Sequence, residues 1–525
     1  AKGAKANATK DNSLSWIWDN IVNYTWKKSV HSITATGVFS AQKYQYDRLY
    51  GASKDLSFNS LWYNLNGGAI ESLTSNFSQW TMMSYVGRIN YGLMDRYLLT
   101  ASLRYDGSSR LSEGNKWALF PSAAIAWRIT EEDFAKNLDW LSNLKLRFSY
   151  GQAGNTNSVS PYASEGTISG SVYYPFGTST SVGNLPANIA NPMLTWERTS
   201  EYNVGLDFGF LNQRISGNIE YYNRTTNDLL MKRNIPVHLG YSSVTSNVGS
   251  VRNSGFELQL NTANIMTKNF AWNTTINLAY NKNEIVSLAD EEDLSNYSIH
   301  LQGMRGRYSD KRFIGKPVDT NWTQNTIGVW QLGEEEEAAK YGCVPGNFKI
   351  KDYNNDGKLT DDDYIIDGKR TPDWTGGMTN MFKIYDFDFS FHMYFQAGAT
   401  QYDRFFENFA LEWNSQNFNN LRTNYWTPEN PSNTMGRPSQ MGSRGNIAYE
   451  KTDFLKVSYI TLGYTLNKRL MSKWGLDNAR IYVTVQNPFI LTKFRGLDPE
   501  QPDLTNIGDT DGMTMNALLG VNISF

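Results

Sequence analysis

The feature that most constrains the fold is an alternation of apolar and polar side chains with a period of two residues. It returns in about fifteen segments of the chain, many of which carry Tyr, Phe or Trp at one end. In one segment Tyr97, Leu99, Ala101, Leu103 and Tyr105 alternate with Thr100, Ser102, Arg104 and Asp106. Successive side chains of a strand point to opposite faces, so each segment predicts a strand with one apolar and one polar face.

The connections between these segments separate a membrane protein from a soluble β-sandwich, whose strands also alternate. Short links follow residue 90 and lie at residues 211–213 and 383–386. The long connections between them are residues 154–198, 284–372 and 399–451. Short periplasmic turns that alternate with long extracellular loops are typical of outer-membrane proteins. We therefore predict an all-β fold, a transmembrane antiparallel β-barrel that takes up residues 1–525 with about fifteen strands.

Composition agrees with this interpretation. Aromatic residues make up 14% of the chain and charged residues 19%, while mean hydropathy is −0.51. No apolar stretch approaches the ~18 residues of a membrane helix, because barrel strands alternate lipid-facing and lumen-facing residues. The net charge of −2 lacks the excess of positive charge that is typical of nucleic-acid-binding proteins. Cys343 is the single cysteine, so neither an intrachain disulfide nor a cysteine metal cluster is expected.

The two ends of the sequence carry different signals. The last strand is expected to have one apolar face, formed by Leu519, Val521, Ile523 and the C-terminal Phe525. Many outer-membrane barrels close with a strand of this kind. Residues 1–12 have no apolar core and do not form a signal peptide. We expect the sequence to be mature or incomplete.

Several stretches resemble the SusC/RagA family of TonB-linked outer-membrane transporters from Bacteroidetes. They occur in the family's order and cover most of the chain from residue 85 onward. The stretches are YLLTASLRYDGSSRL (97–111), FPSAAIAWRITEEDF (120–134), LKLRFSYGQAGN (144–155), NPMLTWERTSEYNVGLDFGF (191–210), GNIEYYNRTTNDLL (217–230) and NVGSVRNSGFELQL (247–260).

The resemblance implies a barrel of roughly 22 strands around an N-terminal plug. This chain would then lack the plug and about seven strands. If Phe525 ends at the periplasm, counting about fifteen strands back places the start of this sequence in an extracellular loop of the full barrel. We expect residues 1–12 to belong to that loop. Unpaired strand edges are costly in lipid, so a separate N-terminal chain or a truncation is expected.

The resemblance also implies active import of a large nutrient through the bacterial outer membrane. The cargo would be an oligosaccharide or, as in RagA-type members, a peptide. Expected partners are a SusD-like surface lipoprotein, and TonB, ExbB and ExbD acting through the missing portion. A passive porin and a surface glycan-binding β-protein are the alternative functions. The residues that contact substrate are not assigned.

A loop motif suggests a structural calcium ion. In DYNNDGKLTDDD, the EF-hand-like positions 1, 3, 5, 7, 9 and 12 are Asp352, Asn354, Asp356, Lys358, Thr360 and Asp363, and Gly357 occupies the turn position. Carboxylate, amide and carbonyl oxygens at this spacing suit a hard cation. The alternative is an Asx-rich turn that binds nothing. The segment and the TPDWTGGM that follows it are also hallmarks of the resembling family on the extracellular side.

No enzyme is predicted and no catalytic residue is assigned. His31, His238, His300 and His392 are scattered without ligand spacing, and no nucleophile elbow, P-loop or zinc motif is present. His392 lies on the polar parity of its strand and is expected to face the lumen. EEEEAAKYG (334–342) is expected to form one helical turn. Trp330, Trp374, Trp413 and Tyr425 are candidates for stacking on sugar rings or on peptide groups.

Overall fold

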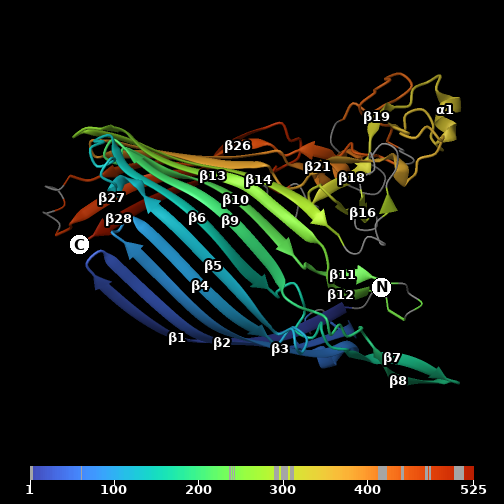
Figure 1. The fold of residues 1–525 in the computed structure, drawn as a ribbon. Helices are drawn as coiled ribbons and strands as arrows, with labels where there is room; N and C mark the ends of the chain where they lie inside the picture. The colour runs from blue at the N-terminus through green and yellow to red at the C-terminus, as the bar shows by residue number, and fades with distance from the viewer. Residues whose placement is uncertain are drawn as a thin grey trace. The chain divides into compact units, whose positions relative to one another are not determined.

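The computed structural model describes residues 4–58, 60, 62–235, 238, 240–241, 243–288, 295–296, 305–307, 312–411, 423–438, 443–467, 471, 475–501 and 513–525. Strands account for most of this part of the chain (Figure 1). Two compact units are present. The first comprises residues 1–127, 148–202 and 224–250, and the second comprises residues 128–147, 203–223 and 251–525.

Fifteen strands form one sheet in which neighbours along the sheet follow one another along the chain. They are β1 (Ala4–Lys28), β2 (His31–Leu56), β3 (Ala69–Leu93), β4 (Tyr97–Ser108), β5 (Trp117–Arg128), β6 (Leu141–Asn155), β9 (Glu197–Phe210), β10 (Ile215–Asn227), β13 (Ser250–Met266), β14 (Phe270–Ser287), β22 (Trp374–Ile384), β23 (Phe387–Ala397), β26 (Phe454–Thr465), β27 (Asn478–Thr492) and β28 (Asn516–Ser524). The pairs from β1 to β5 and from β14 to β28 are antiparallel. The predicted number and type of strands are confirmed.

The exposure of β4 confirms the predicted division between its faces. Tyr97, Leu99 and Leu103 are 45%, 44% and 49% exposed, whereas Thr100 and Ser102 between them are half-buried. Large apolar side chains therefore point away from the protein, which in water would be unfavourable and in lipid is expected.

The predicted turns and long connections also agree with the structure. β9 ends at Phe210 and β10 begins at Ile215, while β22 ends at Ile384 and β23 begins at Phe387. The connection from β6 to β9 contains a hairpin, β7 (Ile168–Phe176) and β8 (Ser179–Pro186). A second hairpin, β11 (Leu230–Asn234) and β12 (Ser243–Asn247), lies between β10 and β13 and was not anticipated.

The expectation of a loop at residues 1–12 is wrong, since β1 begins at Ala4. The expectation rested on small and polar side chains, but backbone pairing does not require apolar ones. Here Ala8 pairs with Gly51, and the Asn12 side chain donates to Asp47 at 2.9 Å. β1, β2 and β3 are 25, 26 and 25 residues long, more than twice the length that crosses a bilayer. Polar cross-strand pairs suit the part of such a strand that lies beyond the lipid.

The remaining elements are short and lie mostly in the two longest connections. They are β15 (Ser295–Asn296), β16 (Arg305–Arg307), β17 (Arg312–Phe313), β18 (Thr320–Gln324), β19 (Thr326–Val329), α1 (Glu335–Lys340), β20 (Phe348–Ile350), β21 (Tyr364–Lys369), β24 (Thr400–Tyr402), α2 (Arg404–Phe406) and β25 (Tyr449–Lys451), with 3₁₀ turns at Leu65–Gly67, Ile129–Glu131 and Asp361–Asp363 and a π turn at Glu407–Leu411. The helical turn predicted for residues 334–342 is confirmed as α1. Within the described residues, none of the helices has the length and apolarity needed to cross a membrane.

Each unit has a buried apolar cluster outside the regular strand alternation. In the first unit Leu111, Ala118, Phe120, Val159, Leu194, Trp196 and Leu230 pack together. Trp196 donates its indole N–H to the Lys116 carbonyl at 2.9 Å, so its polar atom is satisfied where the ring is buried. This cluster ties the hairpin-bearing connections to the ends of β5 and β9. The cluster of the second unit belongs to the site described below.

Candidate functional site

The polar face of β14, β22 and β23 aligns hydrogen-bonding side chains across neighbouring strands. Asn277 lies opposite Gly377, and Gly377 lies opposite Tyr394. Two residues further along each strand, Thr379 lies opposite His392. Residues two apart share a face of a strand, so Tyr394 and His392 lie on one side of the sheet. The polar-face position predicted for His392 is confirmed.

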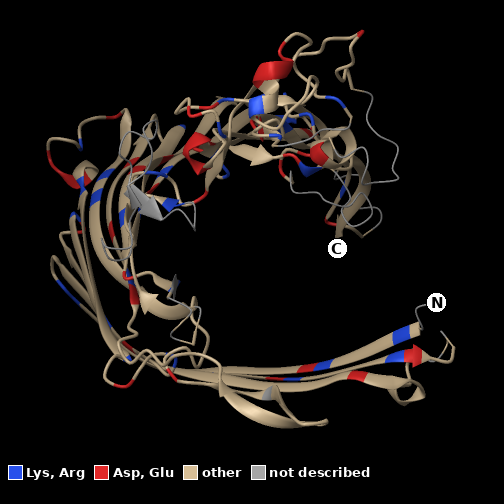
Figure 2. Cartoon of the chain, turned by 90° about the vertical axis from the view of Figure 1, so that its right-hand side faces the viewer, with Lys and Arg blue, Asp and Glu red and all other residues tan. Residues whose placement is uncertain are grey.

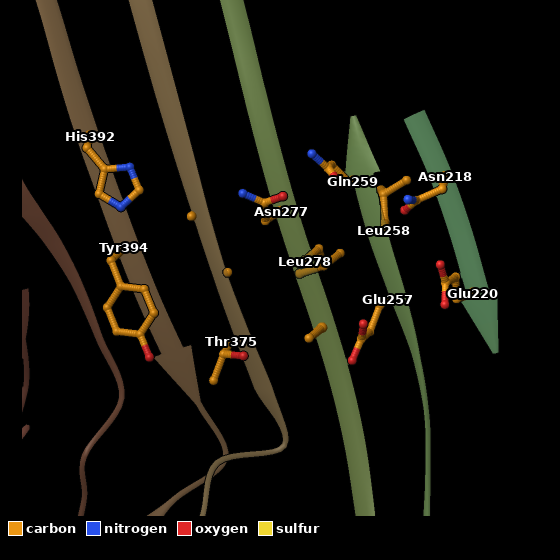
Figure 3. Close-up of a pocket in the computed structure, with 13 residues that line it drawn as sticks. Asn218, Glu220, Glu257, Leu258, Gln259, Asn277, Leu278, Thr375, His392 and Tyr394 are labelled. Atoms are coloured by element: carbon orange, nitrogen blue, oxygen red, sulfur yellow. The ribbon is translucent and has the colours of Figure 1, made fainter. Parts of the chain in front are cut away.

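A cavity of about 560 Å³ opens on this face within the second unit (Figure 3). Its polar lining residues come from five strands: Asn218 and Glu220 of β10, Glu257 and Gln259 of β13, Asn277 of β14, Thr375 of β22, and His392 and Tyr394 of β23. Figure 3 shows the two rings of β23 on one side and the carboxylates of β10 and β13 on the other. The cavity presents amide, hydroxyl, imidazole and carboxylate groups to whatever occupies it.

Gly377 keeps the middle of this cavity open. A Cβ atom at this position would lie 3.0 Å from Cε1 and 3.5 Å from Nε2 of His392. A larger side chain would therefore press against the His392 ring and reduce the space between Asn277 and Tyr394. Glycine inside a strand often marks a place where another group approaches the backbone closely.

His392 is held in place by its neighbours. Its Nδ1 lies 2.8 Å from the Thr379 hydroxyl, and its ring stacks on Tyr459 with 5.6 Å between centroids and 16° between planes. The contact at Nδ1 leaves Nε2 on the side of Gly377. The imidazole can therefore offer one fixed hydrogen-bonding atom to the cavity.

The charges around the cavity are unequal. Arg147 donates to Glu220 at 2.8 Å and to Asp207 at 2.7 Å, and Asn203 donates to Glu220 at 3.1 Å. Glu257 is exposed, and no ion pair to it is formed by the described residues. Figure 2 shows both signs of charge interspersed along the described ribbon. The cavity itself is mildly acidic, because its lining contains two carboxylates and no Lys or Arg among the described residues.

The polar face of the first unit holds a second cavity of about 560 Å³. Its lining includes Arg88, Tyr150, Gln152, Glu201 and Arg224. Gln152 donates to the Tyr150 hydroxyl at 2.8 Å and to Ser200 at 3.2 Å. Thr100 and Ser122, which also line this cavity, lie on the polar faces of β4 and β5, the faces that the sequence pattern assigns to the lumen.

Sequence reasoning placed Thr100 and His392 on the polar faces of their strands, but it assigned none of the cavity residues to a binding site. It grouped Gly376 and Gly377 with the loop hallmark TPDWTGGM, whereas both lie inside β22. A glycine among the residues on the polar face of a strand could have indicated the first cavity, because it leaves space beside the backbone. The cross-strand partners Asn277 and Tyr394 could not be found in this way, because they depend on register.

The described parts of residues 320–369 and 400–451, which we term the loop body, fold together in the second unit. β18 pairs with β21, β19 pairs with β20, and β24 pairs with β25. The Asn433 side chain accepts from the Val329 amide at 2.9 Å, and the Asn446 side chain accepts from the Thr326 amide at 3.0 Å. The Trp426 indole donates to Gln331 at 3.0 Å. Two connections that are far apart in sequence thus form one body.

The loop body has its own apolar core. Its members are Val329 and Phe348 from the first connection and Phe406, Ala410, Leu411, Trp426, Met435 and Ala448 from the second. All are at most 8% exposed. Neither connection could bury these side chains alone, so each supplies part of the other's core.

The predicted cation loop at residues 352–363 is a tight polar turn. Asp352 accepts from the Gly357 amide at 2.9 Å and the Asn355 amide at 2.7 Å, and Asp363 accepts from the Tyr353 amide at 2.8 Å and the Thr360 amide at 2.7 Å. Asn354 and Asp356 accept from amides of the same loop. Gly357 has φ +79°, as its turn position requires.

These hydrogen bonds govern the electrostatics of the loop. Partial burial would raise the pKa of Asp352, but bonds from the Gly357 amide, the Tyr341 hydroxyl and the Asn355 amide outweigh it and the pKa is lowered. Asp352 is therefore ionised at neutral pH, as a calcium ligand must be. Among the described residues, no three His, Cys, Asp or Glu side chains lie close enough together to hold a metal ion. Calcium binding, which would also use Asn354, Thr360 and the Lys358 carbonyl, stays a prediction.

Calorimetry of the detergent-solubilised protein with calcium chloride tests this prediction. We expect binding to the wild type and to Asp361→Asn, an exposed neighbour outside the predicted ligand set, and none to Asp352→Asn. Calcium at about 100 times its Kd should stabilise the loop by about 2.7 kcal/mol. Equal heats from Asp352→Asn and the wild type would place the ion elsewhere, and no heat from the wild type would identify an Asx turn.

The aromatic stacking candidates have different outcomes. Trp330 is 3% exposed, stacks on Tyr341 and lies under the Lys349 ammonium at 4.1 Å, so it is not available to a ligand. Trp374 begins β22 and packs against Phe256 and Tyr280. The prediction for Trp330 is wrong, because its side chain is buried. Trp374 is half-buried and belongs to a strand, not to a long loop, so its stacking role stays a prediction. Tyr425 lines a cavity of about 500 Å³ in the loop body and stays a candidate. Trp413 and His300 lie outside the described residues.

Comparison with known proteins identifies the family. The model described as TonB dependent receptor-like, beta-barrel matches residues 3–375. TonB-dependent receptor P26 of Formosa agariphila is 32% identical over 548 residues, which cover 100% of this chain and 54% of the relative. TonB-dependent receptor SusC of Bacteroides thetaiotaomicron is 35% identical over 457 residues, which cover 85% of this chain and 44% of SusC. The chain spans about half the length of the curated relatives it matches.

Solved structures support the fold. The RagAB peptide transporter superposes with a TM-score of 0.81 at 23% identity, covering 99% of this chain and 56% of that one. Its open-open state gives a TM-score of 0.82. Together with the family match, this likeness confirms the architecture expected from the strand pattern. The chain belongs to the TonB-dependent receptor-like β-barrel proteins of the outer membrane and, within them, to the SusC/RagA family.

Proposed function

We propose that this chain forms part of the wall of an active outer-membrane importer for large oligosaccharides. The observation that carries the proposal is the division of its strands into an apolar face and a polar face hollowed by two cavities of about 560 Å³ each. Amide groups such as those of Asn277 and Gln259 can form the hydrogen bonds that a hydrated, uncharged cargo requires. An apolar cargo would leave these groups without partners.

The proposed importer works with other components. TonB, ExbB and ExbD would supply the energy for import, and a SusD-like lipoprotein would cover the extracellular side. The loop body supports a rigid partner, because its shared apolar core fixes the two connections relative to each other. A preorganised surface binds a partner with less loss of conformational entropy than free loops do.

Uptake of fluorescently labelled neutral oligosaccharides tests the proposal. We expect uptake to fall to background when the gene is deleted, to return on complementation and to require TonB. Uptake that persists without TonB would identify a porin, and uptake of labelled peptides in place of sugars would identify a peptide importer. Recovery of the native protein without detergent would identify a surface glycan-binding protein. The proteins that co-purify in detergent test the partners separately.

A further inference from the structure

We propose that the cavity beside Gly377 is a subsite for one ring of a neutral oligosaccharide. This inference rests on the proposed import of oligosaccharides and adds a place on the polar face where the cargo is held. Neutral sugars present two kinds of surface, a rim of hydroxyl groups and faces of C–H groups. The cavity has a matching wall for each.

The width of the subsite follows from the strand register. Asn277 and Tyr394 both lie opposite Gly377, one on each side of it. Neighbouring strands are about 4.8 Å apart, so the two side chains stand about 10 Å apart, and Gly377 between them contributes no side chain of its own. The result is a trough whose floor is the backbone of Gly377. The imidazole of His392 reaches over one end of this floor, with Cε1 at 3.0 Å and Nε2 at 3.5 Å from where a Cβ atom of Gly377 would be.

One wall of the trough is aromatic. Tyr394 projects from β23 toward Thr375 in Figure 3, and its ring contacts Phe454 with 5.8 Å between centroids. An aromatic ring fixed in this way offers its negatively charged face to polarised C–H groups. Burial raises the energetic value of this contact, because fewer water molecules compete for the ring.

The opposite wall carries hydrogen-bonding groups from three strands. Asn277, Gln259 and Asn218 each offer a carbonyl oxygen and an amide N–H, and Glu257 offers two acceptor oxygens. Adjacent hydroxyl groups on a sugar ring can each donate one hydrogen bond and accept another, so paired amides and carboxylates satisfy them together. Figure 3 shows these side chains on the side of the trough that faces Tyr394.

The charge of the lining selects among sugars. Glu220 is compensated by Arg147, whereas Glu257 has no cationic partner among the described residues. An anionic sugar would place its charge near that carboxylate without a Lys or Arg to balance it. Neutral rings avoid this repulsion, which is why the geometry favours them over uronic or sulfated sugars.

The test uses calorimetry of the protein purified from membranes in detergent, with maltohexaose, cellohexaose and mannohexaose as probes. Gly377→Val fills the trough with a residue that strands favour, and we expect at least about a tenfold loss of affinity, the value of one or two hydrogen bonds. Gly87→Val is the matched control. Gly87 also lies inside a strand, and a Cβ atom there would have nothing within 4 Å. It should bind like the wild type.

Two further variants separate the walls. Tyr394→Ala should weaken binding about tenfold, and Glu257→Gln should improve binding of hexagalacturonate relative to the neutral sugars. Circular dichroism establishes that each variant is folded. If Gly377→Val and Gly87→Val bind alike, the subsite is overturned while oligosaccharide import stands. If the wild type binds no neutral sugar but binds a lysine-rich hexapeptide, both the subsite and the proposed cargo are overturned.

Discussion

Replacing Phe348 by alanine is expected to open the whole loop body, with a loss of about 3–5 kcal/mol in its local stability. Phe348 is 2% exposed and packs in a core that includes Val329 on its own connection and Trp426 and Met435 on the other. Truncation removes the ring and leaves a cavity, and both effects destabilise. Because the two connections share this core, the loss of packing at Phe348 should also destabilise the connection that carries Trp426 and Met435.

Hydrogen exchange measured by mass spectrometry is the appropriate readout. In Phe348→Ala the amides of residues 424–435 should exchange faster although they lie far away in the sequence. The amides of β22 and β23 should keep their protection, since those strands are held by ladder bonds along their full lengths. Ile327→Ala is the matched control, because Ile327 lies on neighbouring β19 and is 49% exposed. Exposed substitutions change stability by about 0.5 kcal/mol or less.

The result also tests how the two connections are organised. Faster exchange confined to residues 326–350 would contradict the shared core and indicate two independent loops. Faster exchange in both connections would show that they form one cooperative unit. That unit is the part of the chain that we expect to meet a lipoprotein partner, so its cooperativity bears on how the partner is recognised.

The sheet could be predicted from the sequence because its signal is local. The alternation in residues 97–106 fixes which side chains share a face, and the short link after Phe210 fixes which strands are neighbours. Neither inference requires knowledge of a distant residue. The same reasoning failed at Ala4–Asn12, where side-chain polarity was taken as a sign of a loop. Backbone ladders form equally well beneath polar side chains.

The site could not be predicted because its contacts are not local. Gly377 and Tyr394 meet only when β22 and β23 are paired in one register, and a shift by one residue would place them on opposite faces. Likewise, Arg147 meets Asp207 and Glu220 across 60 and 73 residues of sequence. Trp330 appeared to be a loop aromatic, yet it is buried by Tyr341 and Lys349. Loop composition does not reveal that two loops share a core.

Asp403 is expected to make the loop body more stable at acid pH than at alkaline pH. Its side chain is 1% exposed, and its Oδ1 accepts from the Phe406 amide at 2.9 Å, which caps the first turn of α2. Its Oδ2 is buried and makes no hydrogen bond with the described residues. Burial raises the pKa of Asp403 from 3.8 to about 6, and the charge of Glu450 adds to this effect while Arg495 opposes it.

The sign of the pH dependence follows from these pKa values. Because the pKa is higher in the folded protein, the folded state binds the proton more tightly than the unfolded state does. The stabilisation is complete below the unfolded pKa of 3.8 and is lost as the pH rises through about 6. A rise of the pKa from 3.8 to about 6 corresponds to about 3 kcal/mol of stability, of which about 1 kcal/mol should be gained between pH 8 and pH 5.

Asp403→Asn isolates this contribution from every other titrating group. Asparagine keeps the oxygen that caps the Phe406 amide and cannot ionise, so the difference in stability between wild type and variant should change by about 1 kcal/mol between pH 8 and pH 5. Exchange of the amides in α2, corrected for the intrinsic effect of pH, measures it. Glu429→Asn, an exposed acid of the same connection, should show no such change. A constant difference for Asp403→Asn would mean that Asp403 stays ionised, and a water molecule or a cation at Oδ2 would then have to balance its buried charge.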